Sequence, residues 1–273
     1  MIFSRFVKFK QAHHTKMNLV EYQSINRVAY ISLNRPDKRN ALSPELVEAL
    51  QNAFDQAKAD DQAKVIVLKA YGEVFSAGAD LAHLQQLQTN NYEENLADSN
   101  RLKTLFYTIY TFPKLVIAQV EGHAIAGGCG LASICDLVFS VPEAKFGYTE
   151  VKIGFIPALV ACFLVRKLGE GRVKELFLSG ELIDAKTALG YGLINFIVDK
   201  EKIGTEVKTY AEKMASTTSA QSIALTKALL GEIYTMNLND SLAKAAMCNA
   251  KVRASEDCQR GIATFLNKER LVW

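Results

Sequence analysis

Two turns of small residues and one carboxylate are the features of this sequence that could do chemistry. The first turn, residues 76–80 (S-A-G-A-D), follows an apolar run at 65–68, and the second, residues 124–130, follows an apolar run at 115–120. Glycines at strand-to-helix turns let backbone N–H groups approach a ligand closely, and a helix start adds partial positive charge. Two such turns can each aim one N–H group at the same oxygen and stabilise negative charge that forms there.

The carboxylate is Glu150, whose neighbours Val151, Ile153, Phe155 and Ile156 are apolar. A carboxyl group in such surroundings keeps its proton to higher pH than in water, which suits acid–base work near neutral pH. We therefore interpret the turns as an oxyanion-stabilising pair and Glu150 as a proton carrier. The alternatives are that the glycines only allow tight turns and that Glu150 lies at a helix end or on the surface.

Composition sets bounds on this interpretation. The chain has 273 residues, of which 49% are hydrophobic, and a net charge of +3. That is enough for one large α/β domain, or a domain with an appendage, and the charge is too small to indicate nucleic-acid binding. Five cysteines without C-x-x-C spacing indicate reduced thiols in an intracellular protein. No apolar run reaches the length of a membrane span, and no metal-binding or redox-cofactor motif is present.

The elements that must position these groups alternate along the chain. Ser43 and Pro44 mark the N-cap and first position of a helix that continues to about Ala59. Asp80 and Asp184 are expected to cap two later helices. Strands are predicted at 28–33, 64–70, 115–120, 136–140 and 193–198. One further helix is predicted to follow the polar stretch at 85–100 and to end at about residue 110. Others are predicted at 157–168, 170–178, 201–217, 220–235, 238–254 and 256–267.

Eight motifs along the chain also carry a family resemblance. They are N-R-P-D-K-R-N-A-L-S at 34–43, F-S-A-G-A-D-L at 75–81, A-I-A-G-G-C-G-L at 124–131, F-G-Y-T-E at 146–150, G-F-I-P-A at 154–158, L-S-G-E-L-I-D-A at 178–185, G-Y-G-L-I-N at 190–195 and G-I-A-T-F-L-N-K at 261–268. In this order they make the chain similar to the crotonase, or enoyl-CoA hydratase/isomerase, superfamily. The resemblance implies an α/β fold with a crotonase-like β/α spiral core at 17–200 and a C-terminal helical trimerisation region at 201–273.

The same resemblance implies a substrate and an assembly. The substrate is expected to be an acyl-CoA thioester, and no cofactor is expected beyond the coenzyme A that belongs to it. A homotrimer or a hexamer built from two trimers is expected, without nucleic acid or membrane partners. Residues 85–100 resemble a mobile lid over the acyl chain. Phe155, Ala158 and Phe163 are the residues expected to shape the acyl pocket.

Site residues follow from the resemblance by matched position. It implies that the backbone N–H groups of Ala77 and Gly127 bind the thioester oxygen and that Glu150 is catalytic. No metal site is implied, and Phe265 and Lys268 are expected to reach the site of a neighbouring subunit. The residues expected to contact substrate or coenzyme A are Lys38, Arg39, Ala41, Ala77, Gly78, Ala79, Asp80, Leu81, Gly127, Gly128, Phe155, Phe265 and Lys268.

One position departs from the family. Many hydratases of the family have two glutamates, and Gly130 stands here at the earlier position. With Glu150 alone, the segments around 127–131 and 149–160 most resemble the branch that hydrates 3-methylglutaconyl-CoA or similar branched enoyl-CoAs in leucine breakdown. We therefore expect an enoyl-CoA hydratase, a lyase that adds water across the 2,3 double bond. The alternatives are a 3,2-enoyl-CoA isomerase, a CoA-thioester decarboxylase and a non-catalytic acyl-CoA-binding protein.

Three further features have minor roles in the interpretation. Residues 1–16 hold four basic residues and no acidic one. We interpret them as a leader or disordered tail of a cytoplasmic protein; a transit peptide, and therefore the mitochondrial matrix, is the alternative. Cys129 near a helix start is a weak candidate for an acidic, nucleophilic thiol, because no histidine–acid pair accompanies it. His123 is interpreted as a packing or turn residue.

Overall fold

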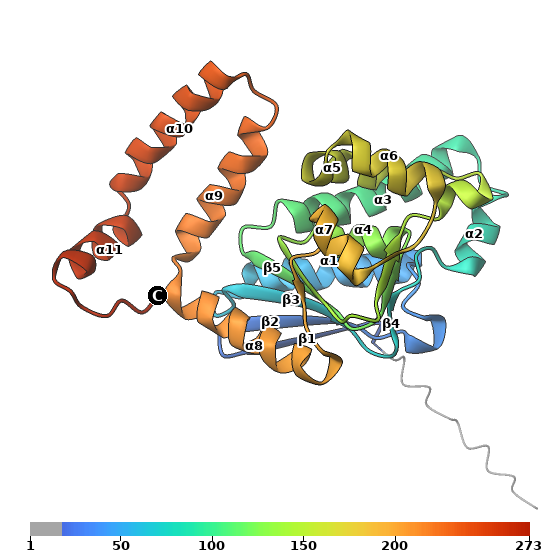
Figure 1. Cartoon of the computed structure of the whole chain (residues 1–273), viewed down its shortest axis with the longest axis horizontal. Coiled ribbons are helices and arrows are strands. Elements are labelled where there is room, and N and C mark those ends of the chain that lie inside the picture. The colour runs from blue at the N-terminus through green and yellow to red at the C-terminus, as the bar shows by residue number, and fades with distance from the viewer. Residues whose placement is uncertain (1–17) are drawn as a thin grey trace, which may run out of the picture.

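Two β-sheets form the framework of the computed structural model, which describes residues 18–273 (Figure 1). The prediction for residues 1–16 lies outside the described residues. The larger sheet contains, in spatial order, β1 (Val20–Ile25), β2 (Val28–Leu33), β3 (Val65–Ala70), β5 (Leu115–Val120), β7 (Leu137–Ser140) and β10 (Phe196–Ile197). The smaller sheet contains β4 (Val74–Ser76), β6 (His123–Ile125), β8 (Lys145–Gly147) and β9 (Ile183–Asp184).

The chain alternates between the two sheets. After β3 it forms β4, after β5 it forms β6, and after β7 it forms β8, so each turn adds one strand to each sheet. The pairs β2–β3, β3–β5, β5–β7, β7–β10, β4–β6 and β6–β8 are parallel, while β1–β2 and β8–β9 are antiparallel. This winding is the β/α spiral expected from the sequence, and the predicted α/β fold is confirmed.

Helices cover the sheets with their apolar faces. In α1 (Pro44–Ala59), Leu46, Leu50 and Phe54 are fully buried, and the Ser43 side chain caps the first turn through the Leu46 N–H group at 3.3 Å. The other helices of this part are α2 (Leu81–Leu87), α3 (Tyr92–Tyr110), α4 (Gly127–Ser133), α5 (Ala158–Leu168), α6 (Glu170–Ser179) and α7 (Ala185–Tyr191). α1 packs against α3, and the Asp184 cap of α7 is confirmed.

The C-terminal helical region has two structurally different parts. α8 (Lys200–Thr217) packs against β2, β3, β5 and β7 and is therefore part of the core. α9 (Ala220–Ile233), α10 (Leu238–Arg253) and α11 (Glu256–Leu266) instead extend away from the sheets (Figure 1). The ion pair between Lys227 of α9 and Asp136 joins this extension to the core at 2.6 Å, and the Trp273 N–H group returns to the Ser216 carbonyl of α8 at 3.0 Å.

The polar stretch at 85–100 is folded as the end of α2 and the first half of α3. Asn91 and Glu94 form a complete capping box at the start of α3, which explains why this polar sequence begins a helix. Its mobility stays a prediction. The strand predicted at 193–198 is limited to Phe196 and Ile197, because the residues before them form a turn after α7. Within residues 18–273, every helix is too short or too polar to cross a bilayer.

Candidate functional site

The functional groups predicted from the sequence follow three neighbouring strands of the smaller sheet. Parallel strands β4, β6 and β8 lead into residues 77–80, Gly127 and Glu150, respectively. Because the carboxyl ends of parallel strands meet at one edge of a sheet, these segments must lie together, and such edges are where α/β proteins bind ligands. Ala77, Ala79, Gly127 and Glu150 all line one cavity of about 290 Å³.

Glycines allow the two small-residue turns to touch. Gly78 has φ +91°, and a Cβ atom there would lie 2.9 Å from the Cβ atom of Ala126. A Cβ atom on Gly128 would lie 2.4 Å from the carbonyl oxygen of Ser76, a distance that no side chain tolerates. Gly78 and Gly128 therefore hold the turns in direct backbone contact, and neither lines the cavity itself.

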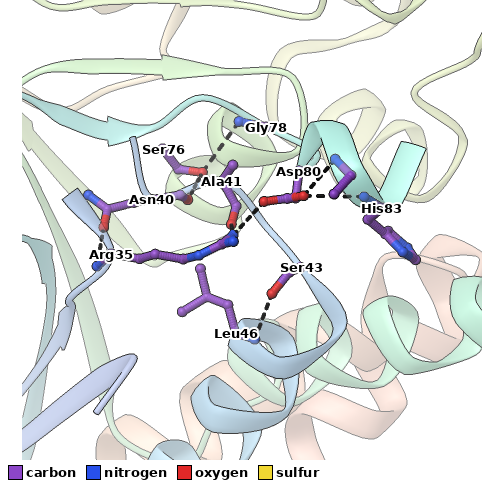
Figure 2. Close-up of polar contacts among 10 residues, drawn as sticks. Arg35, Asn40, Ala41, Ser43, Leu46, Ser76, Gly78, Asp80 and His83 are labelled. Carbon is purple, nitrogen blue, oxygen red and sulfur yellow. Dashed lines mark hydrogen bonds and ion pairs between the residues drawn. The ribbon is translucent and has the colours of Figure 1, made fainter. Parts of the chain in front are cut away.

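A network of hydrogen bonds holds the first turn in place (Figure 2). Arg35 donates to the Asp80 carboxylate at 2.6 Å and to the Ala41 carbonyl at 3.1 Å. The other Asp80 oxygen accepts the backbone N–H groups of Ala82 and His83. Burial alone would raise the pKa of Asp80, but the hydrogen bonds from Arg35 and these amides outweigh it and lower the pKa. Asp80 is thus an ionised helix cap, as predicted.

The donor in the first turn is not the one that the sequence indicated. The Ala77 N–H group donates to the Arg39 carbonyl at 3.0 Å, so the prediction that it binds the thioester is wrong. Ala79 forms a parallel bridge with Leu42, in which the N–H groups of Leu42 and Asp80 make the hydrogen bonds. This pattern turns the N–H group of Ala79 away from Leu42, and it has no partner within residues 18–273. Ala79 therefore supplies the free donor.

The donor of the second turn is Gly127, the first residue of α4. The first N–H groups of a helix have no partner inside it and are available to a ligand. The preceding residue, Ala126, has φ 50° and ψ −126°, a conformation that favours glycine, and its own N–H group is bonded to the Gly147 carbonyl at 2.7 Å. Strain of about 1–3 kcal/mol is typical of such residues. The backbone conformation of Ala126 turns the chain sharply into α4, so that Gly127 faces the cavity.

Glu150 supplies a carboxyl group at the cavity, next to the two turns. It begins a 3₁₀ helix, η2 (Glu150–Ile153), and its Oε2 atom is buried without a hydrogen-bond partner in the part of the chain that the structure describes. Burial raises the pKa of Glu150 above its ordinary value of 4.5, although a hydrogen bond from its own backbone N–H group opposes the shift. A buried carboxyl oxygen without a partner can exchange a proton with a bound ligand or water.

Gly130 occupies the position where many family members have a second glutamate. A Cβ atom on Gly130 would lie 2.3 Å from Cγ1 of Val160 in α5 and 3.2 Å from Cε2 of Phe106 in α3. These two side chains fill the space that a side chain at position 130 would need. Glu150 is therefore the only carboxylate that the first turn of α4 and η2 together bring to the cavity.

This packing makes the Gly130→Ala protein a direct test of the contact. We expect a loss of about 1–3 kcal/mol in the free energy of unfolding, the range for overpacked cores. Val160 is β-branched within a helix and cannot change rotamer easily. The added Val160→Ala change should recover much of the loss, so urea unfolding of both single variants and the double variant should give a clear coupling energy. Additive effects would contradict the contact.

The other predicted contact residues fall into three groups. Leu81 and Phe155 line the cavity, and their contact with substrate stays a prediction. Lys38 and Arg39 are exposed on the loop behind the first turn, while Ala41 is buried and serves the Arg35 network. The structure does not bring Phe265 and Lys268 to the cavity of their own chain, because they belong to the end of the C-terminal extension, where Phe265 is 82% exposed. Their contact with a neighbouring subunit stays a prediction.

The acyl side of the cavity differs from the prediction. Ala158 and Phe163 were expected to line it, but Phe163 packs against Tyr110, with ring centroids 4.9 Å apart. Leucines of the two helices that contain the polar stretch line it instead: Leu84 and Leu87 of α2 and Leu102 of α3. The spacing of Leu81, Leu84 and Leu87 is the helical signal that could have identified this wall in the sequence.

Three polar residues of this wall were also missed. His83, Asp98 and Arg101 line the cavity, and both His83 and Arg101 contact Asp98. Cys129, by contrast, is fully buried, and burial raises the pKa of its thiol to about 12, which rules out the acidic nucleophile considered above. His123 accepts a hydrogen bond from the Lys145 N–H group at 3.2 Å in an exposed position, consistent with a structural role. Residues 18–273 contain no cluster of metal-ligating side chains.

A β/α spiral with two free N–H groups and a buried carboxyl at one cavity defines a class of proteins that stabilise an oxyanion and move protons. The enoyl-CoA hydratase/isomerase family model matches residues 23–273, and the chain belongs to this family. A candidate enoyl-CoA hydratase of Thermus thermophilus is 45% identical over 241 residues, covering 88% of this chain and 95% of the relative. The predicted enzyme class, a hydro-lyase of the enoyl-CoA hydratase type, agrees with this membership.

Two further comparisons cover nearly all of both chains. A crotonyl-CoA hydratase of Syntrophomonas wolfei is 30% identical over 246 residues, covering 89% of this chain and 93% of the relative. The crystal structure of an enoyl-CoA hydratase from Shewanella pealeana superimposes with a TM-score of 0.88 at 30% identity, covering 94% of this chain and 97% of that structure. The similarity therefore extends over the sheets, the cavity and the C-terminal extension.

Proposed function

We propose that the chain hydrates the 2,3 double bond of an enoyl-CoA thioester. The observation that carries the proposal is the convergence of Ala79, Gly127 and Glu150 on one cavity. The thioester oxygen accepts hydrogen bonds from the Ala79 and Gly127 N–H groups, which draw electron density from the β-carbon. The Glu150 carboxylate takes a proton from water as the water oxygen bonds to the β-carbon, and an enolate forms. Glu150 then returns that proton to the α-carbon.

A single carboxyl group is sufficient for this sequence of steps. The proton removed from water is the proton delivered to carbon, so atoms and charge balance without a second acid. This requires that water and proton add to the same face of the double bond, within reach of one carboxyl. The side chains that fill the space beside Gly130 support this one-base route.

We further propose 3-methylglutaconyl-CoA, or a similar branched and carboxylated enoyl-CoA, as the substrate. The segments around 127–131 and 149–160 support this choice through their resemblance to that branch of the family. The cavity is apolar along Leu84, Leu87 and Leu102, and it also contains Arg101, a cation that a carboxylated acyl chain needs.

Product analysis by mass tests the reaction. The purified protein is incubated with 3-methylglutaconyl-CoA, crotonyl-CoA and a 3-enoyl-CoA. Gain of one water, mainly on the methylglutaconyl thioester, is expected. Loss of carbon dioxide would identify a decarboxylase instead, and binding without any turnover would identify an acyl-CoA-binding protein.

The 3,2-enoyl-CoA isomerase remains the second candidate function, and the filled space at Gly130 favours it as well. An isomerase moves one proton between the α- and γ-carbons, and one base is enough for that. Rearrangement of the 3-enoyl-CoA without a change of mass, and no hydration of the other two thioesters, would establish it.

The pH dependence of kcat/KM should report the environment of Glu150. The carboxylate form takes the proton from water, so activity must fall as the pH drops through the pKa of Glu150. Because burial raises that pKa above 4.5, the acid limb should lie at higher pH than for an ordinary glutamate. A pH–rate profile for crotonyl-CoA measures it, and an acid limb at or below pH 4.5 would contradict the assignment.

We also propose a homotrimer, or a hexamer of two trimers, assembled through the C-terminal extension. Large apolar side chains are exposed on it, among them Leu230, Leu242, Met247, Phe265 and Leu266. Isolated exposed apolar residues are common, but many of them on one extension support an interface there. Sedimentation analysis tests the mass. A cytoplasmic location, or the mitochondrial matrix if residues 1–16 are a transit peptide, stays a prediction.

A further inference from the structure

His83, Asp98 and Arg101 form a polar cluster on the acyl side of the cavity, separate from the groups that act on the thioester. The His83 Nε2 atom lies 3.1 Å from Asp98 Oδ1, and an Arg101 terminal nitrogen lies 3.0 Å from the same oxygen. The His83 and Asp98 side chains are largely buried, 11% and 22% exposed. Asp98 thus contacts one basic side chain from α2 and one from its own helix.

The cluster has unused hydrogen-bonding capacity. The Nδ1 atom of His83 is buried and has no partner among residues 18–273, although buried polar atoms are normally paired. Across the same residues, Arg101 makes one side-chain hydrogen bond, to Asp98, and its other N–H groups are free. His83 and Arg101 therefore each have a nitrogen without a partner, and with protons on both ring nitrogens of His83 the two side chains can donate to the two oxygens of a carboxylate.

We propose that this cluster recognises a carboxylate at the far end of the acyl chain, and that His83 takes up a proton when the carboxylate binds. The inference rests on the proposed acyl-CoA substrate and names its class. One carboxylate oxygen accepts from His83 Nδ1–H and the other from Arg101. His83 Nε2–H continues to donate to Asp98.

Charge balance explains the proton uptake. In the empty cluster, the charges of Asp98 and Arg101 cancel each other. A bound carboxylate brings one negative charge, and the proton on His83 restores neutrality in a site partly shielded from water. A methyl-terminated acyl chain brings no charge and gives His83 no reason to gain a proton.

The other charged groups nearby do not replace this role. Glu45 of α1 lies close enough that its lowered pKa depends in part on His83, with the Ser43 hydrogen bond as the largest cause. Asp80, which caps α2 at the His83 backbone, is already paired with Arg35. Glu150 lines the same cavity and is needed for chemistry. All three groups are acidic, so none of them can pair with a bound carboxylate.

Calorimetry with two saturated thioesters tests the proposal without turnover. Glutaryl-CoA ends in a carboxylate, whereas pentanoyl-CoA has the same number of acyl carbons and ends in a methyl group. For the full chain we expect uptake of up to one proton with glutaryl-CoA and none with pentanoyl-CoA, measured in two buffers of different ionisation enthalpy near pH 7.5. Affinity for glutaryl-CoA alone should fall as the pH rises.

Two variants test whether His83 and Arg101 bind the carboxylate. His83→Gln should weaken glutaryl-CoA binding about 10- to 100-fold relative to pentanoyl-CoA, the range for a hydrogen bond to a charged group, and should abolish the proton uptake. Arg101→Gln, at a half-exposed position that tolerates change, should lower the same ratio. Lys103→Gln is the matched control, because it removes a positive charge from an exposed position of α3 that does not line the cavity.

The outcomes separate this inference from the proposed function. Equal binding of the two thioesters, or proton uptake that persists in His83→Gln, overturns the carboxylate site even if the protein hydrates crotonyl-CoA. Selective, proton-linked binding of glutaryl-CoA by a protein that hydrates none of the enoyl thioesters supports the site and overturns the hydratase.

Discussion

Replacing Glu150 by glutamine should lower kcat at least 10²- to 10⁴-fold, the range assigned to general acid–base catalysis. Glutamine has nearly the same shape but cannot accept a proton from water or return one to carbon. Substrate binding should change little, because the thioester is held by backbone N–H groups and the acyl wall. The expected signature is therefore a large fall in kcat with KM within a few-fold of the parent value, measured by steady-state kinetics.

The folded state should tolerate this change. Burial raises the pKa of Glu150, which means that the ionised side chain is unfavourable where it stands. Glutamine removes that charge, so thermal unfolding should occur at the same temperature as in the parent protein or slightly above it. Glu181→Gln is the control, since Glu181 is an exposed partner of Lys152. A folded Glu150→Gln protein with near-full turnover would contradict the proposed mechanism.

The second large effect should come from deleting one backbone N–H group. Incorporating lactic acid in place of Ala79 exchanges the amide for an ester and removes the proposed donor without changing a side chain. Loss of one oxyanion donor typically costs about 10²–10³ in kcat. We expect a fall of that size with the fold preserved, because this N–H group has no partner within residues 18–273.

The same exchange at Ala77 is the matched control. Its N–H group donates to Arg39, so the ester should cost about 0.5–1.5 kcal/mol of stability and affect kcat far less. Chemical denaturation and kinetics on the two esters separate the roles. If the Ala77 ester loses more turnover than the Ala79 ester, the assignment of the oxyanion donor to the Ala79 N–H group is wrong.

The difference between these two alanines illustrates what the sequence can and cannot predict. The turn is visible in the sequence as small residues before a capped helix. Which of its N–H groups stays free depends on Leu42 and Arg39, which reach the turn from more than thirty residues away. No local pattern describes such contacts, and the structure was needed to correct Ala77 to Ala79.

The lengths of the helices and strands explain most of the remaining differences between the predicted and the observed fold. Most of the long helices and the strands β2, β3, β5 and β7 have enough residues to show a period, and they were predicted to within a few residues, whereas β1 was not predicted. Strands β4, β6 and β8 have three residues each, which is too few for alternation to be read. Yet these strands align the catalytic segments, so their joint position could not be derived from pattern alone.

The polar wall of the cavity was missed for a different reason. Asp98 lies in the stretch at 85–100 that resembles a mobile lid, and His83 and Arg101 lie just outside it. Their meeting depends on how α2 packs beside α3, which is a tertiary contact. The three-residue spacing of leucines in α2 was the available signal that one side of this helix lines the cavity.

The packing of Val160 against Gly130 also limits which substitutions this chain can accept during evolution. A glutamate cannot be accepted at position 130 while Val160 stands 2.3 Å from the site of its Cβ atom. A smaller residue at 160 would have to come first, and alone it would leave a void and lower stability. The two-glutamate and one-glutamate arrangements are thus separated by an intermediate that selection disfavours, and a lineage that has adopted one of them will tend to keep it.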